Sequence, residues 1–357
     1  MPPQYGMATS KNTKTGINPD FSVKSRKTKD LSYYLNGLQN KNRYILSECI
    51  TLLESTHEAK RKLAEAILDS LSNVPDGTIR VGITGSPGVG KSTFIETFGT
   101  YLLEQKHRIA ILAVDPSSQK NKGSILGDKT RMQNLAVHPD AFIRPSPAGD
   151  VLGGTAAYTK EAIQLCESAG FDFIIVETVG VGQSEIEVDH ITDINILLLQ
   201  PGAGDDIQGI KRGIVENADV FIINKADGQQ LELAKQTKIA YTNAIQLFHH
   251  DIKDWTCPVL LTSAIENTGM EQVYESILQY IRLLKQNGQF KLRRQLQEKK
   301  WFEKQTKQRL YQIVFENKKV SEVFFSQAEQ LKMGGISTRS AIQRMEATIR
   351  SILNTDD

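Results

Sequence analysis

The sequence predicts an α/β fold, with a mainly parallel sheet between an N-terminal helical region and a C-terminal helical arm. Between residues 78 and 285, short apolar runs alternate with amphipathic helical stretches, whereas no strand pattern occurs after residue 286. Strands that are buried on both faces read as continuous apolar runs, so this alternation is typical of parallel strands joined by covering helices. A chain of 357 residues is long enough for about two domains and a sizeable core.

We expect four regions along the chain. They are a disordered basic tail, an N-terminal helical region, the α/β domain and the helical arm, at residues 1–30, 31–77, 78–285 and 286–357. The helical region is indicated by Leu63, Ile67 and Leu71, which recur every four positions. Near the end of the arm, a narrow apolar stripe is typical of a helix–helix seam, either within the chain or with a second subunit. The stripe consists of Ile342, Met345, Ile349 and Ile352.

The first apolar run of the α/β domain, Ile79–Thr84, leads into Gly85-Ser-Pro-Gly-Val-Gly-Lys91-Ser92 and then into a helical pattern. This matches G-x-x-x-x-G-K-[ST] in the strand–loop–helix setting that a phosphate-binding loop requires. Its glycines let backbone N–H groups turn inward around phosphates, and the helix N-terminus adds positive partial charge. We therefore expect a nucleoside triphosphate here, with Lys91 at the β- and γ-phosphates and Ser92 on Mg²⁺.

A second motif predicts which base is bound. The apolar run Val220–Ile223 ends in Asn224-Lys-Ala-Asp227, an N-K-x-D element. A carboxylate at Asp227 can accept hydrogen bonds from N1–H and the amino group of guanine, whereas adenine has no such paired donors. By itself the element could be a polar turn after a strand, but downstream of a phosphate loop it indicates guanine. We expect Asn224 to tie this loop to the phosphate loop and the stem of Lys225 to cover a face of the base.

A third loop follows the apolar run Pro258–Leu261 and reads Thr262-Ser-Ala-Ile265. The backbone N–H of Ala264 is our candidate donor to the carbonyl oxygen of guanine. Together the two loops predict selection of GTP over ATP, because ATP would leave the carboxylate of Asp227 unpaired.

Two further apolar runs end in acidic residues. Ile109–Val114 is followed by Asp115, and Phe173–Val176 is followed by Glu177-Thr-Val-Gly180. An acidic residue at the carboxyl end of a strand beside the phosphate loop is suited to hold Mg²⁺ and its waters. Glu177 stands where the common D-x-x-G motif has Asp, and we expect the Gly180 amide to sense the γ-phosphate.

The glycine-rich, charged stretch Gly123–Met132 is our candidate for the first switch. For Asp128 and Arg131 within it, the alternative is a solvated surface loop, since loops are polar in any case. Directly after Gly180 stands Val181, where Ras-like enzymes carry the Gln that orients the attacking water. We therefore expect weak intrinsic hydrolysis that a partner accelerates by ordering the switches.

Three segments closely resemble the MeaB/ArgK/MMAA family, namely Val176–Glu185, the candidate switch Gly123–Met132 and Pro201–Arg212. The similarity covers residues 40 to 355 and is tightest from the phosphate loop to the N-K-x-D element. The resemblance implies a GTPase that acts as a chaperone for adenosylcobalamin-dependent methylmalonyl-CoA mutase. It would hydrolyse GTP with Mg²⁺ and water, without a covalent intermediate or a tightly bound organic cofactor, and gate loading, protection and reactivation of the mutase. In this family the arm makes a homodimer, so we expect a dimer.

The resemblance also implies roles for residues at matching positions. Phosphate binding falls to Gly85, Ser86, Pro87, Gly88, Val89, Gly90, Lys91, Ser92 and Thr93. The Mg²⁺ positions are Ser92, Asp115, Asp128 and Glu177, and the catalytic positions are Lys91, Asp128, Glu177 and Gly180. The guanine positions are Asn224, Lys225, Asp227, Ser263, Ala264 and Ile265.

The segment Gly202–Lys211 resembles an additional switch of the family, which relays the nucleotide state to the mutase. Gln208 and Lys211 are the candidate residues for this coupling. The alternative is a glycine-rich loop with solvated charges, which is common after a parallel strand.

Composition limits the partners and the cellular location that we expect. The net charge of +2 is too small to indicate wholesale nucleic-acid binding. No apolar run approaches the ~18 residues of a membrane span, and the polar N-terminal tail is no secretory signal. Three scattered cysteines indicate reduced, buried thiols in a cytoplasmic protein. A mitochondrial matrix location applies only if the source is eukaryotic.

The stretch Lys285–Arg309 contains nine Lys or Arg residues and two Glu residues. Such a helix could bind nucleic acid or anionic lipid. Without an aromatic stacking platform or a strong apolar face, however, the pattern favours a solvated helix surface. We therefore expect neither a nucleic acid nor a membrane as partner.

Two other functions are weighed against the mutase chaperone. Metal-insertion GTPases carry Cys-rich or His-rich ion sites, whereas this chain has six scattered His, and His249-His250-Asp251 fits a polar surface turn better than a ligand set. The second alternative is an ArgK-type kinase of a transport protein. It is disfavoured because no catalytic loop of the H-R-D type is present.

Overall fold

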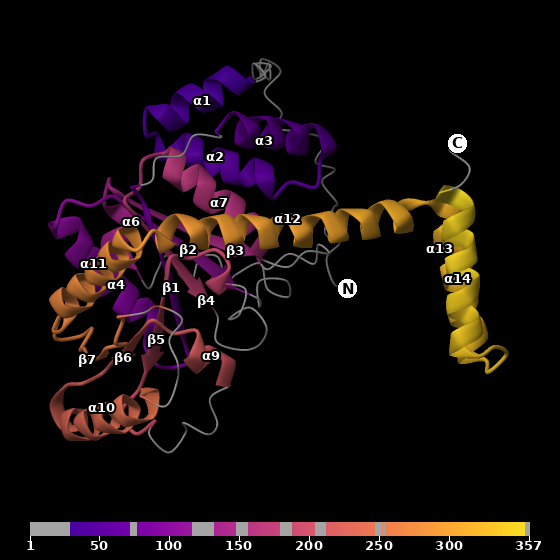
Figure 1. Cartoon of the computed structure of the whole chain (residues 1–357). Coiled ribbons are helices and arrows are strands. Elements are labelled where there is room, and N and C mark those ends of the chain that lie inside the picture. The colour runs from indigo at the N-terminus through magenta and orange to yellow at the C-terminus, as the bar shows by residue number, and fades with distance from the viewer. Residues whose placement is uncertain are drawn as a thin grey trace, which may run out of the picture.

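The computed structural model describes residues 29–71, 77–115, 132–147, 156–178, 188–203, 212–246, 252 and 254–353. Within these ranges, a 7-stranded parallel sheet lies between layers of helices, and a helical arm projects from the body (Figure 1). The strands are β1 (Ile79–Gly85), β2 (Ile109–Asp115), β3 (Ala141–Pro147), β4 (Phe173–Thr178), β5 (Ile194–Leu199), β6 (Val220–Ile223) and β7 (Val259–Leu261). Their order across the sheet is β3-β2-β4-β1-β5-β6-β7. The predicted α/β class is confirmed.

Strands β3 and β5 come in addition to the five apolar runs singled out from the sequence. Strand β3 carries Pro145 and Pro147, which are unfavourable inside a sheet because proline has no N–H. The strand is tolerated because it lies at an edge. The Ile109 N–H donates to the Asp140 carbonyl at 2.9 Å, and this register turns the odd-numbered N–H positions of β3 away from β2. Both prolines therefore remove donors from the open edge and leave the ladder intact.

Three apolar clusters fix the helices on the sheet. One face packs against α4 (Lys91–Glu104) and α11 (Met270–Gln286), through side chains such as Val81, Ile111, Ile175 and Ile196. On the other face, α7 (Ala156–Ser168) and the N-terminal helices cover Ala110, Leu112, Ile174 and Val176. Farther along that face, α10 (Leu231–Ile245) covers Leu197, Leu199, Phe221 and Ile223. The body also contains the short helices α6 (Gln133–Val137), α9 (Arg212–Glu216) and η3 (Gly228–Gln230).

The N-terminal helices are α1 (Leu31–Gln39), α2 (Arg43–Leu53) and α3 (Glu58–Ser70), as the periodicity predicts. Two of them begin at side-chain caps, because the Asp30 carboxylate accepts from Tyr33 N–H and the Asn42 side chain accepts from Tyr44 and Ile45 N–H.

The arm consists of α12 (Gln289–Glu316), α13 (Lys318–Lys332) and α14 (Thr338–Leu353). Helix α12 runs along the body and then leaves it, and α13 and α14 pack side by side at its far end (Figure 1). The apolar stripe of α14 therefore forms a seam within the chain, in part: Met345, Ile349 and Ile352 are half-buried, whereas Ile342 is 61% exposed.

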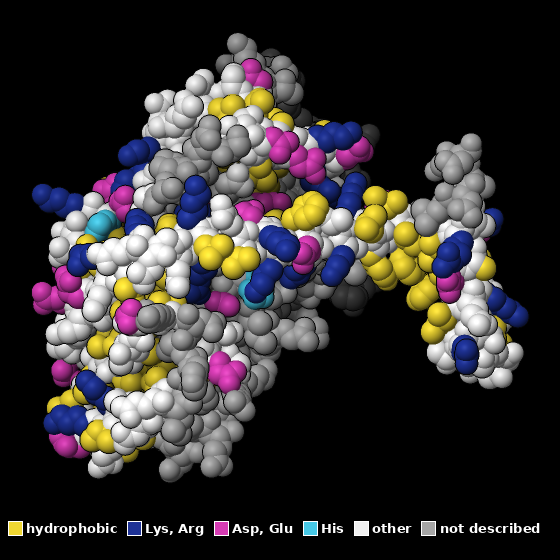
Figure 2. Space-filling view, viewed as in Figure 1, with side chains coloured by type: hydrophobic (Ala, Val, Ile, Leu, Met, Phe, Trp, Pro, Cys, Tyr) yellow, Lys and Arg dark blue, Asp and Glu magenta, His cyan; other side chains and the backbone are white. Residues whose placement is uncertain are grey.

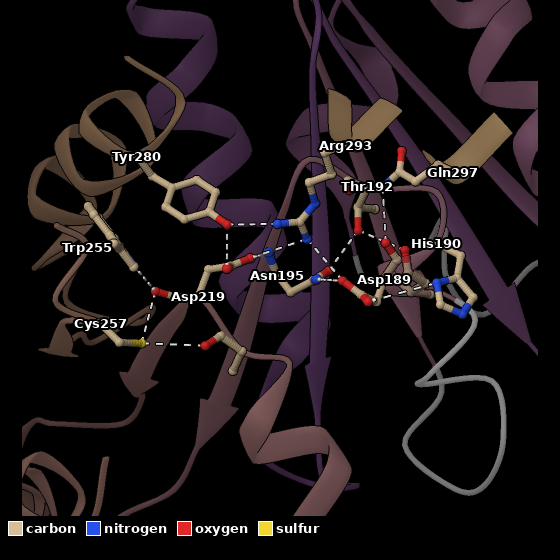
Figure 3. A network of polar contacts seen from close by, with 12 residues as sticks. Asp189, His190, Thr192, Asn195, Asp219, Trp255, Cys257, Tyr280, Arg293 and Gln297 are labelled. Atoms are coloured by element: carbon tan, nitrogen blue, oxygen red, sulfur yellow. Dashed lines mark hydrogen bonds and ion pairs between the residues drawn. The ribbon is translucent and has the colours of Figure 1, made fainter. Parts of the chain in front are cut away.

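A buried polar network holds the base of α12 at the amino ends of β5 and β6, opposite the phosphate-loop edge (Figure 3). Arg293 Nη2 lies 3.0 Å from Asp189 Oδ1 and 3.8 Å from Asp219 Oδ2, and Arg293 Nη1 donates to Tyr280 Oη at 2.8 Å. One turn later, Gln297 Nε2 donates to the carbonyl oxygens of Asp189 and Thr192 at 3.1 and 2.7 Å. These contacts tie the arm helix to the sheet.

The neighbouring Arg294 makes a second set of contacts with the body. It pairs with Asp193 at 2.7 Å and donates to the Thr78 carbonyl at 2.7 Å. The expectation of a solvated surface for Lys285–Arg309 is therefore wrong for these two arginines. Burial pulls the pKa of Arg293 down, but the combined attraction of the facing groups Asp219, Tyr280, Asp189 and Asp193 outweighs burial, so this pKa is raised and the guanidinium stays charged.

The three cysteines are unpaired and buried, as expected. Burial raises the pKa of the Cys49 thiol to about 12, which keeps it protonated and unreactive. Among the helices that the structure describes, none has the length and apolar character needed to cross a membrane.

Replacing Arg293 with Met should lower the free energy of unfolding by about 3–5 kcal/mol, because Asp189 and Asp219 would lose the guanidinium between them. The matched control is Arg309→Met, since Arg309 lies on the exposed surface of the same helix and should change stability by about 0.5 kcal/mol or less. Urea unfolding of the full chain measures both. Equal effects of the two variants would contradict a docking role for Arg293.

Candidate nucleotide-binding site

The phosphate loop joins β1 to α4 at the carboxyl edge of the sheet. Gly88 and Gly90 have φ angles of +82° and +94°, a region that side chains with a Cβ rarely adopt. A Cβ on Gly90 would lie 2.8 Å from Asn224 Nδ2, and one on Gly85 would lie 2.6 Å from the Leu198 carbonyl. The loop therefore needs glycine both for its shape and for its close neighbours.

Lys91 and Ser92 begin α4, directly after this loop. Lys91 Nζ donates to the Gly85 carbonyl at 2.6 Å and to the Ser86 carbonyl at 3.4 Å, so the ammonium lies against the loop. Ser92 Oγ donates to Glu177 Oε1 at 3.3 Å. Glu177 is the penultimate residue of β4 and is only 7% exposed, which holds its carboxylate beside the loop.

The pair formed by Ser92 and Glu177 fits a magnesium ion. One hydroxyl and one carboxylate oxygen are hard donors, and Mg²⁺ usually completes its shell with water and substrate phosphates. Asp115 ends β2 on the same edge, but its side chain lies outside what the structure describes. Asp128, Gly180, Gln208 and Lys211 also lie outside the described residues.

The N-K-x-D loop is hydrogen-bonded to the phosphate loop. Asn224 Nδ2 donates to the Val89 carbonyl at 3.0 Å, which is the tie expected from the sequence, and Asn224 is 1% exposed. The other end of its amide, Oδ1, accepts from Thr262 Oγ1 at 3.3 Å. Lys225 has φ +59° and its Nζ donates to the Gly88 carbonyl at 2.6 Å. The base loop and the phosphate loop thus hold one another directly.

The third loop positions the acidic residue. Ser263 Oγ lies 2.5 Å from Asp227 Oδ2 and accepts from the Glu266 N–H at 3.1 Å. Ser263 also exchanges two backbone hydrogen bonds with Thr268, at 3.0 and 3.1 Å. The buried Ser263 therefore holds the Asp227 carboxylate from one side, and the next residue, Ala264, is 9% exposed. Ile265, in contrast, is 81% exposed.

The carboxyl ends of four strands thus bring together the predicted phosphate, Mg²⁺ and guanine residues that the structure describes. Two supporting residues were missed by sequence reasoning. Thr262 orients Asn224, and Thr97 of α4 donates its hydroxyl to the Ala264 carbonyl at 2.8 Å. Thr262 opens the third loop, where it was assigned no role of its own. Thr97 belongs to no phosphate or base motif, and 167 positions separate it from Ala264. No local sequence signal could have found this contact.

A phosphate loop joined to an N-K-x-D loop on a parallel sheet defines the class of P-loop GTPases. A family model described as Methylmalonyl Co-A mutase-associated GTPase MeaB matches residues 46–319. The chain belongs to this MeaB family and is a GTP hydrolase. The resemblance inferred from the sequence is confirmed.

Relatives and a solved structure agree with this assignment. GTPase ArgK of Escherichia coli is 38% identical over 90% of this chain and 97% of its own length. The mouse protein named Methylmalonic aciduria type A homolog, mitochondrial, is 44% identical over 74% of this chain and 66% of its own length. The crystal structure of LAO/AO transport system kinase superposes with a TM-score of 0.72 at 32% identity, over 90% of this chain and 97% of that one.

Replacing Asp227 with Asn should weaken GTP binding by about 10- to 100-fold, because a charged hydrogen-bond acceptor is lost. The same change should improve binding of xanthosine triphosphate, whose 2-oxo group accepts from the new amide. Calorimetric titration measures both, with Glu266→Gln as the control, since Glu266 is an exposed carboxylate in the neighbouring loop. An unchanged preference for GTP would contradict the guanine assignment.

Proposed function

We propose that this protein is a Mg²⁺-dependent GTPase that acts as a chaperone for adenosylcobalamin-dependent methylmalonyl-CoA mutase. The nucleotide state would gate cofactor loading and promote protection and reactivation of the mutase. The observation that carries the nucleotide part is the direct hydrogen bonding of the N-K-x-D loop to the phosphate loop, through Asn224–Val89 and Lys225–Gly88. The client is suggested by the family description and by the printed name of the mouse relative.

The chemistry is hydrolysis of the GTP phosphoanhydride by water. Bound Mg²⁺ would neutralise charge on the β- and γ-phosphates. Ser92 and Glu177 would hold it at the carboxyl end of β4, with Asp115 and Asp128 as further candidates. Lys91 would bind the β- and γ-phosphates and stabilise charge that develops as the bond breaks. No covalent intermediate or tightly bound organic cofactor is needed.

Switching would depend on the segments around the γ-phosphate. We assign Asp128 to the first switch, Gly180 to the amide that senses the γ-phosphate, and Gln208 and Lys211 to coupling with the mutase. Val181 stands where Ras-like enzymes place a water-orienting Gln. Turnover by the isolated protein would therefore be slow, and the client would accelerate it by ordering these segments.

The region after residue 286 is proposed as a dimerisation arm. The part of the arm next to the body is rich in Lys and Arg, and the outer part carries large apolar side chains. Figure 2 shows these apolar side chains gathered around the junction of α12 with the helix pair α13 and α14. Phe302, Phe325 and Met333 are 66, 65 and 80% exposed. Apolar patches of this kind mark protein–protein contacts. A second copy of the arm would cover them in a homodimer, and we place this protein in the cytoplasm.

The two alternatives have little or no support. Within the described ranges, no group of three or more His, Cys, Asp or Glu side chains could hold a metal ion, and His249–Asp251 lies outside those ranges. The kinase alternative rests on the printed title of one solved structure. It differs from hydrolysis in the fate of the γ-phosphate, which would move to a transport protein instead of water.

The purified protein should hydrolyse GTP at least about tenfold faster when purified adenosylcobalamin-dependent methylmalonyl-CoA mutase is added. Labelled γ-phosphate released as inorganic phosphate is the readout. Lys91→Ala is the control and should abolish turnover with and without the mutase, because transition-state charge is no longer stabilised. A fast rate that is independent of the mutase would contradict the chaperone assignment, and label on a periplasmic binding protein would favour the kinase.

Light scattering should give about twice the chain mass of 39.8 kDa at micromolar protein concentration. The double variant Phe302→Ser/Phe325→Ser should give the monomer mass, since the apolar area that the second arm covers would be reduced. Val137→Ser is the matched control, because Val137 is an apolar residue on the body of the protein that is 77% exposed, more than either Phe. A monomeric native protein would refute the proposed dimer.

A further inference from the structure

Thr97 behaves differently from the other threonine in the middle of its helix. The hydroxyl of a helical threonine commonly bonds back to the carbonyl four residues earlier. Thr100 does this, donating to the Glu96 carbonyl at 2.8 Å, as do Thr237 and Thr242 on α10. The Thr97 hydroxyl instead leaves α4 and donates to the Ala264 carbonyl at 2.8 Å. The contact is therefore a bond between elements, made by the helix that begins at Lys91.

The backbone of Ala264 is held on both sides. The peptide that contains the Ala264 N–H also contains the Ser263 carbonyl, which accepts from the Thr268 N–H at 3.0 Å. The peptide that contains the Ala264 carbonyl is held by Thr97. In a trans peptide the C=O and N–H groups point in opposite directions. The two contacts therefore turn the N–H groups of Ala264 and Ile265 away from Thr268 and from α4.

No residue within the described ranges accepts a hydrogen bond from the Ala264 N–H. The neighbouring Ser263 side chain faces Asp227, the candidate partner of the guanine N1–H and amino group. A donor beside that carboxylate suits the adjacent oxygen of the same base edge, the 6-oxo group. The described contacts thus orient a hydrogen-bond donor where a purine 6-oxo group would need one.

From this geometry we infer that Thr97 is a positioning residue for guanine recognition, which acts by fixing the Ala264 and Ile265 amides for the 6-oxo group of the base. The inference rests on the proposed binding of GTP at this site. It adds to guanine recognition a residue that lies outside the N-K-x-D and phosphate motifs. The Thr97–Ala264 hydrogen bond is a third contact between the phosphate loop with its helix α4 and the base-binding loops, beside Asn224–Val89 and Lys225–Gly88.

The test compares Thr97→Val, which removes only the hydroxyl, with Thr97→Ser, which keeps it. Dissociation constants are measured by calorimetry for GTP, for inosine triphosphate and for 2-aminopurine riboside triphosphate, which lacks the 6-oxo group. Thr97→Val should weaken GTP and inosine triphosphate about fivefold and the 2-aminopurine nucleotide less than about twofold. Thr97→Ser should bind the three nucleotides as tightly as the native protein does. Thr100→Val, the control on the same helix, should leave all three dissociation constants unchanged.

An equal loss for all three nucleotides would overturn the inference, because it would indicate general loosening of the fold. Unchanged binding of GTP by Thr97→Val would also overturn it. If Thr97→Val fails to fold, Thr97→Ala carries the same comparison. Absence of GTP binding by the native protein would sink the inference together with the proposed nucleotide site, whereas a failed response to the mutase leaves it standing.

Discussion

The site depends on one buried amide, the side chain of Asn224. Its nitrogen donates to the Val89 carbonyl in the phosphate loop, and its oxygen accepts from Thr262 beside the third loop. Because the residue is 1% exposed, water cannot replace either partner. Leaving a buried amide unsatisfied costs about 1–3 kcal/mol. This requirement keeps three loops, which come from distant parts of the chain, in a single arrangement.

Glycine makes that arrangement possible. A Cβ on Gly90 would enter the space of the Asn224 amide, and a Cβ on Gly269 would lie 2.4 Å from the Leu261 carbonyl. The first position lets the loops approach each other, and the second lets the chain turn after β7. The phosphate loop and base loop thus hold one another through their own contacts, and mutual bracing of this kind lowers the entropic cost of binding a ligand.

The two edges of the sheet carry different parts of the proposed function. The carboxyl edge holds the residues proposed to bind the nucleotide, whereas the amino edge holds the arm helix through Arg293, Arg294 and their carboxylates. Charged pairs of this kind fix the orientation of the segments they join more than they add net stability, because the cost of desolvating the charges offsets most of their attraction. The arm is therefore fixed in direction relative to the sheet.

The sequence by itself determined the phosphate loop, the N-K-x-D loop, Glu177 near the end of a strand and the helices on either side of the α/β domain. These features are local: glycine spacing, apolar periodicity and strand-to-loop order follow from neighbouring residues. Only the tertiary structure decided the partner of Thr97, the contacts of Arg293 and Arg294 with carboxylates of the body, and the place of β3 at an edge that tolerates Pro145 and Pro147. Each of these depends on which distant segments the fold brings together, and a pattern along the chain does not encode that.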